Sequence, residues 1–113
     1  MRISAYTKYD EEHWAIEIKS RKQDLEEYDK IPLTCKKYCL MKEERKEDER
    51  LFYISIVNGE EYYLFDMDKI NWNKVECRFW GIRKTQVDDK SDKVKTPCFF
   101  IPITEAIWNG QLI

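Results

Sequence analysis

Two runs of alternating apolar and polar residues near the N-terminus predict a β-hairpin. Residues 1–9 and residues 13–19 each alternate with a period of two, which is typical of a half-buried strand. The acidic residues 10–12 between them are predicted to form a polar turn. With that turn, Glu17 on the second strand is expected to face Ala5 on the first.

The next stretch predicts the one main helix of the chain. Residues 21–30 are polar and are expected to form a connection that ends before a proline. Thr34 is a suitable N-cap, and we expect a helix from there to about residue 46. Cys35 and Cys39, with a tyrosine at position 38 between them, recur at helical spacing and predict its apolar face.

The residues after the helix predict a second hairpin. Residues 51–57 are dense in β-branched and aromatic side chains, and residues 62–65 resume the same pattern. Between them, Asn58-Gly59 is a strong hairpin signal, because both central residues of a type I′ turn have positive φ. We therefore expect a two-residue turn at these positions.

Two further strands are predicted at residues 75–82 and 96–103. Pro97 and Pro102 cannot donate hydrogen bonds to a ladder, so the second of these strands is expected at a sheet edge. Residues 104–108 predict a short closing helix. The element order β-β-α-β-β-β-β, followed by that helix, predicts an α+β fold in which one main helix packs on a mostly antiparallel sheet.

Length and composition place the whole chain, residues 1–113, in a single domain. Apolar residues make up 42% of the sequence, which is enough for a core, while 37% of residues are charged and the net charge is −2. This balance argues against a protein that holds duplex DNA mainly by bulk electrostatics, although it leaves room for a local basic groove. Neither a signal-peptide pattern nor an apolar run of membrane-spanning length is present, so we expect a cytoplasmic protein without a membrane partner.

The four cysteines are predicted to be reduced thiols, with neither a disulfide nor a bound metal. Cys35 and Cys39 are four residues apart on the predicted helix, whereas a zinc knuckle has the spacing C-x₂-C. Such a pair on an apolar helix face is typical of buried thiols. A zinc or iron–sulfur site that also uses Cys77 and Cys98 is the alternative.

Glu17 and Lys19 are the residues that point to chemistry, because their spacing places both side chains on one face of a strand. A carboxylate can hold a divalent cation such as Mg²⁺, and a neighbouring lysine can orient the attacking water in phosphodiester hydrolysis. The segment Trp14–Arg21, WAIEIKSR, resembles the third motif of the PD-(D/E)XK nucleases, in which an apolar strand delivers E-x-K to the active site. The resemblance implies a restriction-endonuclease-like core, with Glu17 as metal ligand, Lys19 as the water-orienting cation and, in an active member, Mg²⁺ as the only cofactor.

The sequence departs from that family in the second carboxylate, an Asp that normally begins the neighbouring strand. The positions expected opposite the motif, residues 4–6, are not acidic, and Asp10 would lie about five residues along, roughly 16 Å from Glu17. The helix that precedes this strand in the family also has no counterpart, so the resemblance is to a truncated form. Either a partner subunit completes the site, or the site is inactive, or another acid substitutes: Asp66, Asp68 or Glu76.

Basic and aromatic residues elsewhere predict a binding surface. Alternation along residues 75–82 places Phe79 inward and Arg78 and Trp80 outward, and an exposed Trp beside Arg is a common interface anchor. Residues 83–95 hold five basic side chains against three acidic ones. The candidate binding residues are Arg21, Lys37, Arg78, Trp80, Arg83 and Lys84.

Two functions are consistent with these features. The first is a non-catalytic, degenerate PD-(D/E)XK-like protein from a phage or mobile element. It would bind nucleic acid or a host protein, for example as an inhibitor of a host defence nuclease, and a homodimer is one arrangement. The second is an active Mg²⁺-dependent DNA endonuclease that uses Glu17 and Lys19. The absent Asp favours the first function and the E-x-K pattern favours the second.

Overall fold

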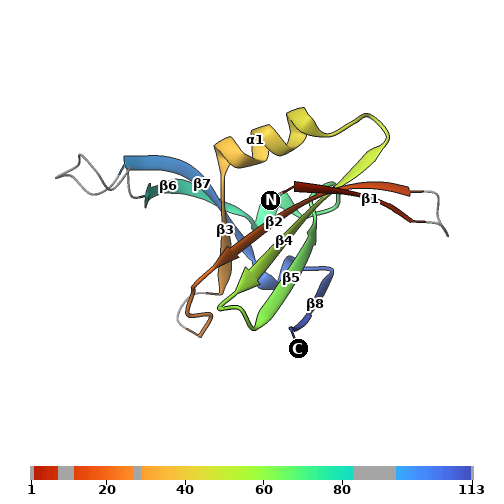
Figure 1. Cartoon of the computed structure of the whole chain (residues 1–113). Helices are drawn as coiled ribbons and strands as arrows, with labels where there is room; N and C mark the ends of the chain where they lie inside the picture. Colours follow the sequence, from red (N-terminus) through yellow and green to blue (C-terminus); the bar gives the residue numbers. More distant parts are fainter. Residues whose placement is uncertain (1, 8–11, 27–28, 83–93, 113) are drawn as a thin grey trace, which may run out of the picture.

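The computed structural model describes residues 2–7, 12–26, 29–82 and 94–112. In this part of the chain eight strands form two sheets, and one α-helix accompanies them (Figure 1). The coarse prediction of a strand-rich α+β fold is therefore confirmed, but the strands form two sheets instead of one. None of the described helices has the length and apolar character needed to cross a membrane.

The larger sheet has the strand order β1-β2-β4-β5-β8. Its strands are β1 (Arg2–Thr7), β2 (Glu12–Arg21), β4 (Glu49–Val57), β5 (Glu61–Asp66) and β8 (Trp108–Gln111). Strands β2 and β4 are parallel and all other neighbours are antiparallel. A parallel pair needs a crossover connection, and here β3 and the helix provide it.

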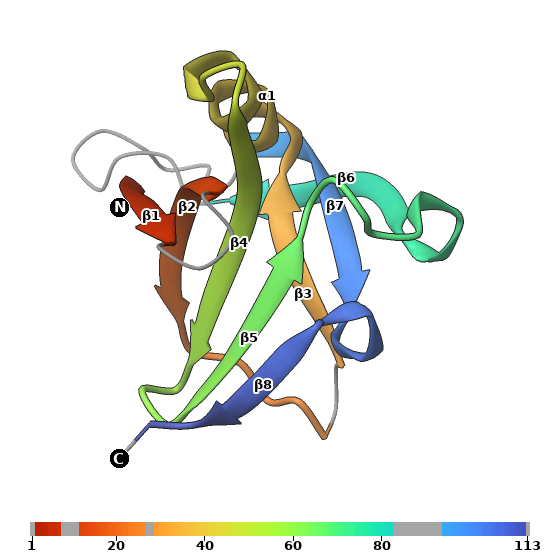
Figure 2. The same ribbon diagram turned by 90° about the vertical axis from the view of Figure 1, so that its right-hand side faces the viewer.

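The smaller sheet is antiparallel and has the strand order β3-β7-β6. Its strands are β3 (Lys30–Thr34), β7 (Val94–Pro102) and β6 (Glu76–Ile82). The helix α1 (Cys35–Glu44) follows β3 directly and leads to β4. Figure 2 shows α1 at the end of the molecule where β3 ends and β4 begins.

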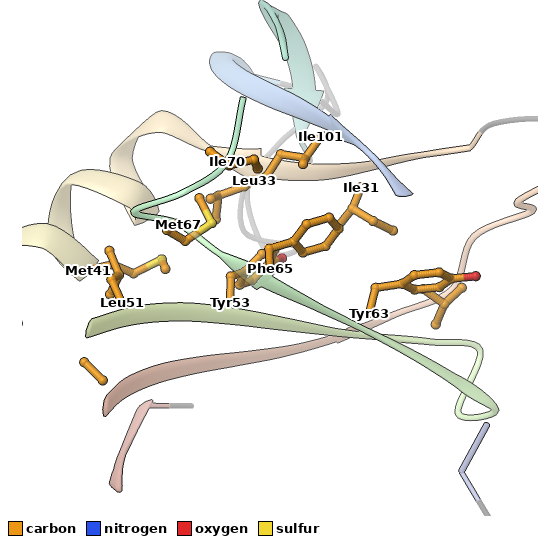
Figure 3. Close-up of a cluster of buried hydrophobic side chains, with 12 residues drawn as sticks. Ile31, Leu33, Met41, Leu51, Tyr53, Tyr63, Phe65, Met67, Ile70 and Ile101 are labelled. Atoms are coloured by element: carbon orange, nitrogen blue, oxygen red, sulfur yellow. The ribbon is translucent and has the colours of Figure 1, made fainter. Parts of the chain in front are cut away.

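The hydrophobic core lies between the two sheets (Figure 3). Tyr53 on β4 and Phe65 on β5 meet Ile31 on β3 and Ile101 on β7, and all four side chains are buried. Met41 is the residue of α1 that is fully buried in this cluster. Each such side chain stabilises the fold by roughly 1.5–3 kcal/mol, which is why both sheets present their apolar faces to each other.

The N-terminal hairpin is present, but its predicted register is wrong by three residues. Glu17 pairs with Arg2 instead of Ala5, and Thr7 pairs with Glu12. Glu12 therefore belongs to the strand and not to the turn. Its carboxylate accepts hydrogen bonds from Nε1 of Trp14, at 2.8 Å, and from an arginine of β4, which hold this residue in the ladder.

The helix confirms the predicted N-cap. Oγ1 of Thr34 accepts a hydrogen bond from the backbone N–H of Lys37 at 3.2 Å, and the helix ends at Glu44. The predicted apolar face is wrong at Cys39, which is exposed. Because α1 packs against β3 and β7, the side chain that enters the core is that of Met41, two residues further along.

The turn at Asn58-Gly59 confirms the predicted backbone conformation, with φ of 56° and 68°. The predicted two-residue loop is wrong, because Val57 pairs with Glu61 and three residues lie between them. The backbone N–H of Glu60 donates to the carbonyl of Val57 at 3.1 Å and closes the turn. Glu60 is therefore the additional loop residue.

The prediction that the proline-containing strand lies at an edge is wrong, because β7 is the central strand of the smaller sheet. It pairs with β3 over residues 98–102 and with β6 over residues 94–100, so only three residues are paired on both sides. Pro97 lies outside the first ladder and Pro102 outside the second. Each proline therefore has one side without a ladder partner, and its missing N–H is tolerated there.

Two strands were not expected from the sequence. β3 contains Pro32 and follows a polar run, and β8 is only four residues long. Residues 104–108, predicted to form a helix, instead contain the end of a single 3₁₀ turn, Ile103–Glu105, and the first residue of β8. Both strands depend on pairing with distant partners, β7 and β5, and not on a local alternating pattern.

Candidate functional site

Three alternating residues of β2, Glu17, Lys19 and Arg21, line a pocket of about 120 Å³ beside β3 and α1. Lys37 of α1 and Tyr53 of β4 complete its charged and polar walls. The structure thus brings together four of the residues singled out from the sequence. The pocket has the lining residues Glu17, Lys19, Arg21, Leu33, Thr34, Lys37 and Tyr53.

Glu17 is a buried carboxylate paired with a lysine. Its side chain is 6% exposed, and Oε1 lies 3.0 Å from Nζ of Lys37, whose side chain is 44% exposed. Burying a carboxylate is costly unless a cation or hydrogen bonds compensate it. Lys37 is well placed for this because its backbone N–H is bonded to the N-cap, Thr34, which fixes the first turn of the helix.

The position opposite Glu17 is not acidic. β1 places Arg2 there, and the positions expected to carry the second carboxylate, residues 4–6, pair instead with residues 13–15. Asp10 lies outside the described residues. The residue that pairs with Glu17 in the ladder is therefore an arginine, where the nuclease pattern requires an acid.

The three substitute acids are also wrong as partners for Glu17. Asp66 pairs with Phe52 across the ladder whereas Glu17 pairs with Tyr53, so the two carboxylates lie on opposite faces of the sheet. The side chain of Asp66 is 1% exposed and forms an ion pair with Arg50. The other two are held elsewhere by basic side chains: Asp68 by Arg45, and Glu76 by Lys30.

This arrangement does not fit a hard divalent cation. Mg²⁺ requires several oxygen ligands, and a lone carboxylate next to an ammonium group offers too little negative charge. Among the residues that the structure describes, no group of three or more His, Cys, Asp or Glu side chains is placed to hold a metal ion. Glu17 acts here as the partner of Lys37.

A second, larger pocket of about 350 Å³ adjoins the first, and Arg21 lines both. The guanidinium carbon of Arg78 lies 4.3 Å from the centre of the Phe100 ring, within the range of a cation–π contact. The side chain of Phe79 is 70% exposed at the pocket's edge. The pocket has the lining residues Arg21, Lys22, Gln23, Pro32, Arg78, Phe79 and Phe100.

Arg21 has unused hydrogen-bonding capacity at the junction of the two pockets. One terminal nitrogen donates to the hydroxyl of Tyr53 at 3.4 Å, and burial raises the pKa of that hydroxyl, which therefore stays neutral. The buried Nε of Arg21 has no hydrogen-bond partner among the described residues. An unsatisfied buried donor costs about 1–3 kcal/mol. Nε itself is enclosed by protein, so an external anion would meet Arg21 through its terminal nitrogens.

The combined charge of the two pockets is strongly positive. Five cationic side chains and one carboxylate line them, a net charge of +4 in a chain whose total is −2. Arg78 is also 3.7 Å from Glu76, which moderates its charge at the outer rim. None of the ion pairs found among the described residues involves Lys19 or Lys22. An anion that reaches Arg21 would therefore meet a basic groove.

The backbone beside Arg21 is fixed by a side chain from the second hairpin. Oδ1 of Asn58 accepts from the backbone N–H of Gln23 at 2.9 Å, and Nδ2 donates to the carbonyl of Gln23 at 2.7 Å. The backbone N–H of Asn58 donates to the carbonyl of Arg21 at 2.8 Å. Asn58 thus extends the pairing of β2 and β4 by one step and positions the segment that lines both pockets.

The remaining predicted binding residues have different outcomes. Arg78 lines the larger pocket. The side chain of Trp80 lies outside the part of the structure that is described, as do Arg83 and Lys84 altogether. Phe79, predicted to point inward, is exposed instead, so the face of β6 that carries it is not the face turned to the core.

Several residues of the site were missed from the sequence. Lys22 and Gln23 lie in a run that reads only as a polar connection, and the ring of Phe100 belongs to a strand that was placed at an edge. The available signal was composition: the run after E-x-K carries two further basic residues, Arg21 and Lys22. Their convergence with β6 depends on the tertiary fold.

The four cysteines gather where the start of α1 meets the smaller sheet, and all are thiols in the structure. Sγ of Cys35 lies 4.0 Å from Sγ of Cys77. Burial, together with the hydrogen bond to Cys77, raises the pKa of Cys35 to about 11. Cys98 is buried and Cys39 is exposed, so the prediction of two buried helix thiols is wrong for Cys39.

Comparison with known proteins leaves the family open. No protein-family model, no curated protein and no solved structure matches this chain. The functional argument therefore rests on the geometry of the two pockets.

Proposed function

We propose that this protein is a non-catalytic nucleic-acid-binding protein that holds phosphate groups in the two pockets joined at Arg21. The observation that carries the proposal is the cluster of five cations around one carboxylate that is already paired with Lys37. Arginine and lysine bind phosphate oxygens through charge-assisted hydrogen bonds, and Arg21 lines both pockets.

The low overall charge of the chain shapes the expected affinity. Because the net charge is −2, long-range attraction contributes little and binding depends on the local contacts of the groove. With a local net charge of +4, the logarithm of the binding constant is expected to fall with the logarithm of salt with a slope of about −3 for a single strand. Binding should therefore be weak to moderate and clearly dependent on salt.

We further propose that the chain is a degenerate relative of the PD-(D/E)XK nucleases. The support is the E-x-K strand itself, since Glu17 and Lys19 of β2 line one pocket. Hydrolysis in that family needs a metal. Among the described residues no cluster of acidic side chains joins Glu17 to hold one, and Glu17 is itself paired with Lys37. The motif residues would then serve binding and folding, while hydrolysis is the alternative that the experiment must exclude.

Fluorescence anisotropy with labelled single-stranded DNA, single-stranded RNA and duplex DNA tests the proposal between about 50 and 200 mM salt. Arg21→Gln is expected to weaken binding about tenfold and to reduce the salt slope by about one. Lys36→Gln is the matched control, because Lys36 is an exposed lysine next to Lys37 that lines neither pocket. Equal effects of the two substitutions, or no binding to any nucleic acid, would overturn the proposal.

A cleavage assay on the same substrates with Mg²⁺ or Mn²⁺ tests the non-catalytic part. We expect no metal-dependent products. Cleavage that disappears in both Glu17→Ala and Lys19→Ala would show that the protein is a nuclease.

A further inference from the structure

We propose that the larger pocket receives one unstacked base of a single strand, with Phe79 as the stacking platform. This inference rests on the proposed nucleic-acid binding and adds the class of substrate. It concerns the face formed by β6, β7 and the end of β2. Arg21, which lines both pockets, would then bind the phosphate, and the aromatic residues of the larger pocket would bind the base.

The size and lining of the larger pocket suit a flat aromatic ligand. Its volume of about 350 Å³ is at the lower end of the range for small-ligand sites. Pro32 and Phe100, which are largely buried, form its apolar floor, and the guanidinium of Arg78 lies over the Phe100 ring at 4.3 Å. Planar guanidinium groups and aromatic rings both stack on bases.

Phe79 has an exposure that its contacts in the protein do not explain. A phenylalanine on a strand normally packs against neighbours, yet 70% of this side chain is accessible at the rim of a pocket. On the neighbouring strand it faces Pro97, which is itself exposed. A base stacked on this ring would cover apolar surface that the fold leaves open.

The position of Arg21 connects the base to a phosphate. Arg21 lines both pockets, so a phosphate held by its guanidinium would place the attached nucleotide at the entrance of the larger pocket. In a duplex the bases are stacked inside the helix and cannot reach a pocket beside their own phosphate without being unpaired. In a single strand every base has an accessible π-face, which is why aromatic platforms favour single strands.

The test compares Phe79→Ala with Trp108→Ala, which truncates another exposed aromatic residue, on β8, that lines neither pocket. Base–aromatic stacking is worth about 1–3 kcal/mol, so Phe79→Ala is expected to weaken single-strand binding about 5- to 150-fold. Phe79→Trp should retain binding, and Trp108→Ala should leave it unchanged. An oligonucleotide of abasic sites should bind the native protein as weakly as an ordinary strand binds Phe79→Ala.

The outcomes separate this inference from the proposed function. If Arg21→Gln weakens binding while Phe79→Ala does not, the base pocket is wrong and the phosphate site stands. Equal losses for duplex and single strand in Phe79→Ala would also overturn the base pocket. If the native protein binds no nucleic acid, both proposals fail. Because Phe79 is exposed, its truncation should leave the midpoint of urea unfolding unchanged, which shows that a loss of binding does not come from unfolding.

Discussion

Substitutions of Asn58 can separate two contributions to stability: the hydrogen bonds of its side chain and its positive φ. Its side-chain amide forms two hydrogen bonds with the backbone of Gln23, at 2.9 and 2.7 Å, and its own φ is 56°. The bond from its backbone N–H to the carbonyl of Arg21 does not involve the side chain and is available to every variant. The three substitutions Ala, Gly and Asp remove different parts of this arrangement.

The expected magnitudes follow from those parts. Asn58→Ala loses both side-chain bonds, at about 1 kcal/mol each, and places a Cβ-bearing residue in the left-handed region at a further cost of about 1 kcal/mol. Asn58→Gly accommodates the positive φ but also loses both bonds, so the free energy of unfolding should fall by about 2 kcal/mol. Asn58→Asp retains the acceptor Oδ1 for the N–H of Gln23, but it replaces the donor by a carboxylate oxygen that repels the carbonyl of Gln23, so the loss should be at least about 1 kcal/mol.

Urea titration followed by tryptophan fluorescence measures the free energy of unfolding of the three variants, provided that the slope with urea is unchanged. Asn109→Ala is the control, because Asn109 is an exposed asparagine of β8 and its loss should cost less than about 0.5 kcal/mol. The signature of these two roles is that Asn58→Ala is more damaging than Asn58→Gly and that Asn58→Gly is more damaging than the control. Asn58→Gly as stable as the native chain would refute the role of the amide, and Asn58→Ala no worse than Asn58→Gly would refute the role of φ.

Three other predictions concern the rest of the fold. Because burial raises the pKa of Cys35 to about 11 from 9.0, its thiolate fraction near pH 8 should be about 100-fold lower than ordinary, and mass spectrometry should show slow alkylation by iodoacetamide. Burial alone would raise the pKa of Asp68, but the hydrogen bonds from Arg45 and the backbone N–H of Leu51, together with the charges of Arg45 and Arg50, outweigh it and lower the pKa from 3.8. The associated stability is present above the unfolded pKa and lost as pH falls through the folded one, so Arg45→Ala should flatten the loss of stability below about pH 4. Gly110→Ala would place a Cβ 2.9 Å from the ring of Tyr62 and should cost about 1 kcal/mol by urea titration, a cost that Tyr62→Ala should abolish.

Features that depend on a few neighbouring residues could be predicted from the sequence. The N-cap at Thr34 needs only its hydroxyl and the N–H three residues on, and the positive φ of Asn58-Gly59 follows from the two residue types. The shared face of Glu17 and Lys19 follows from the period of a strand. In each case the local chain contains the physical cause.

Features that depend on distant partners could not be predicted in the same way. The register of the first hairpin changes because Glu12 is held by Arg50, which is 38 residues away in the chain. β8 exists because β5 pairs with it, although its four residues show no alternating pattern. Phe79 reads as a buried position from alternation, yet its side chain is 70% exposed, an outcome that only the tertiary arrangement decides.

The charge around the E-x-K motif of β2 also depends on a distant element, the helix α1. β2 alone presents a carboxylate and an amine two residues apart, a pattern that suits metal-dependent hydrolysis. In the folded protein α1 adds Lys37 at 3.0 Å from Glu17, and the ladder adds Arg2 at the opposite position. The carboxylate is thereby paired inside the protein, and on the proposed function the cations around it, Arg21 foremost, would attract an external anion. A short motif therefore constrains which side chains share a face, while the charges that surrounding elements bring to that face determine whether it favours a cation or a phosphate.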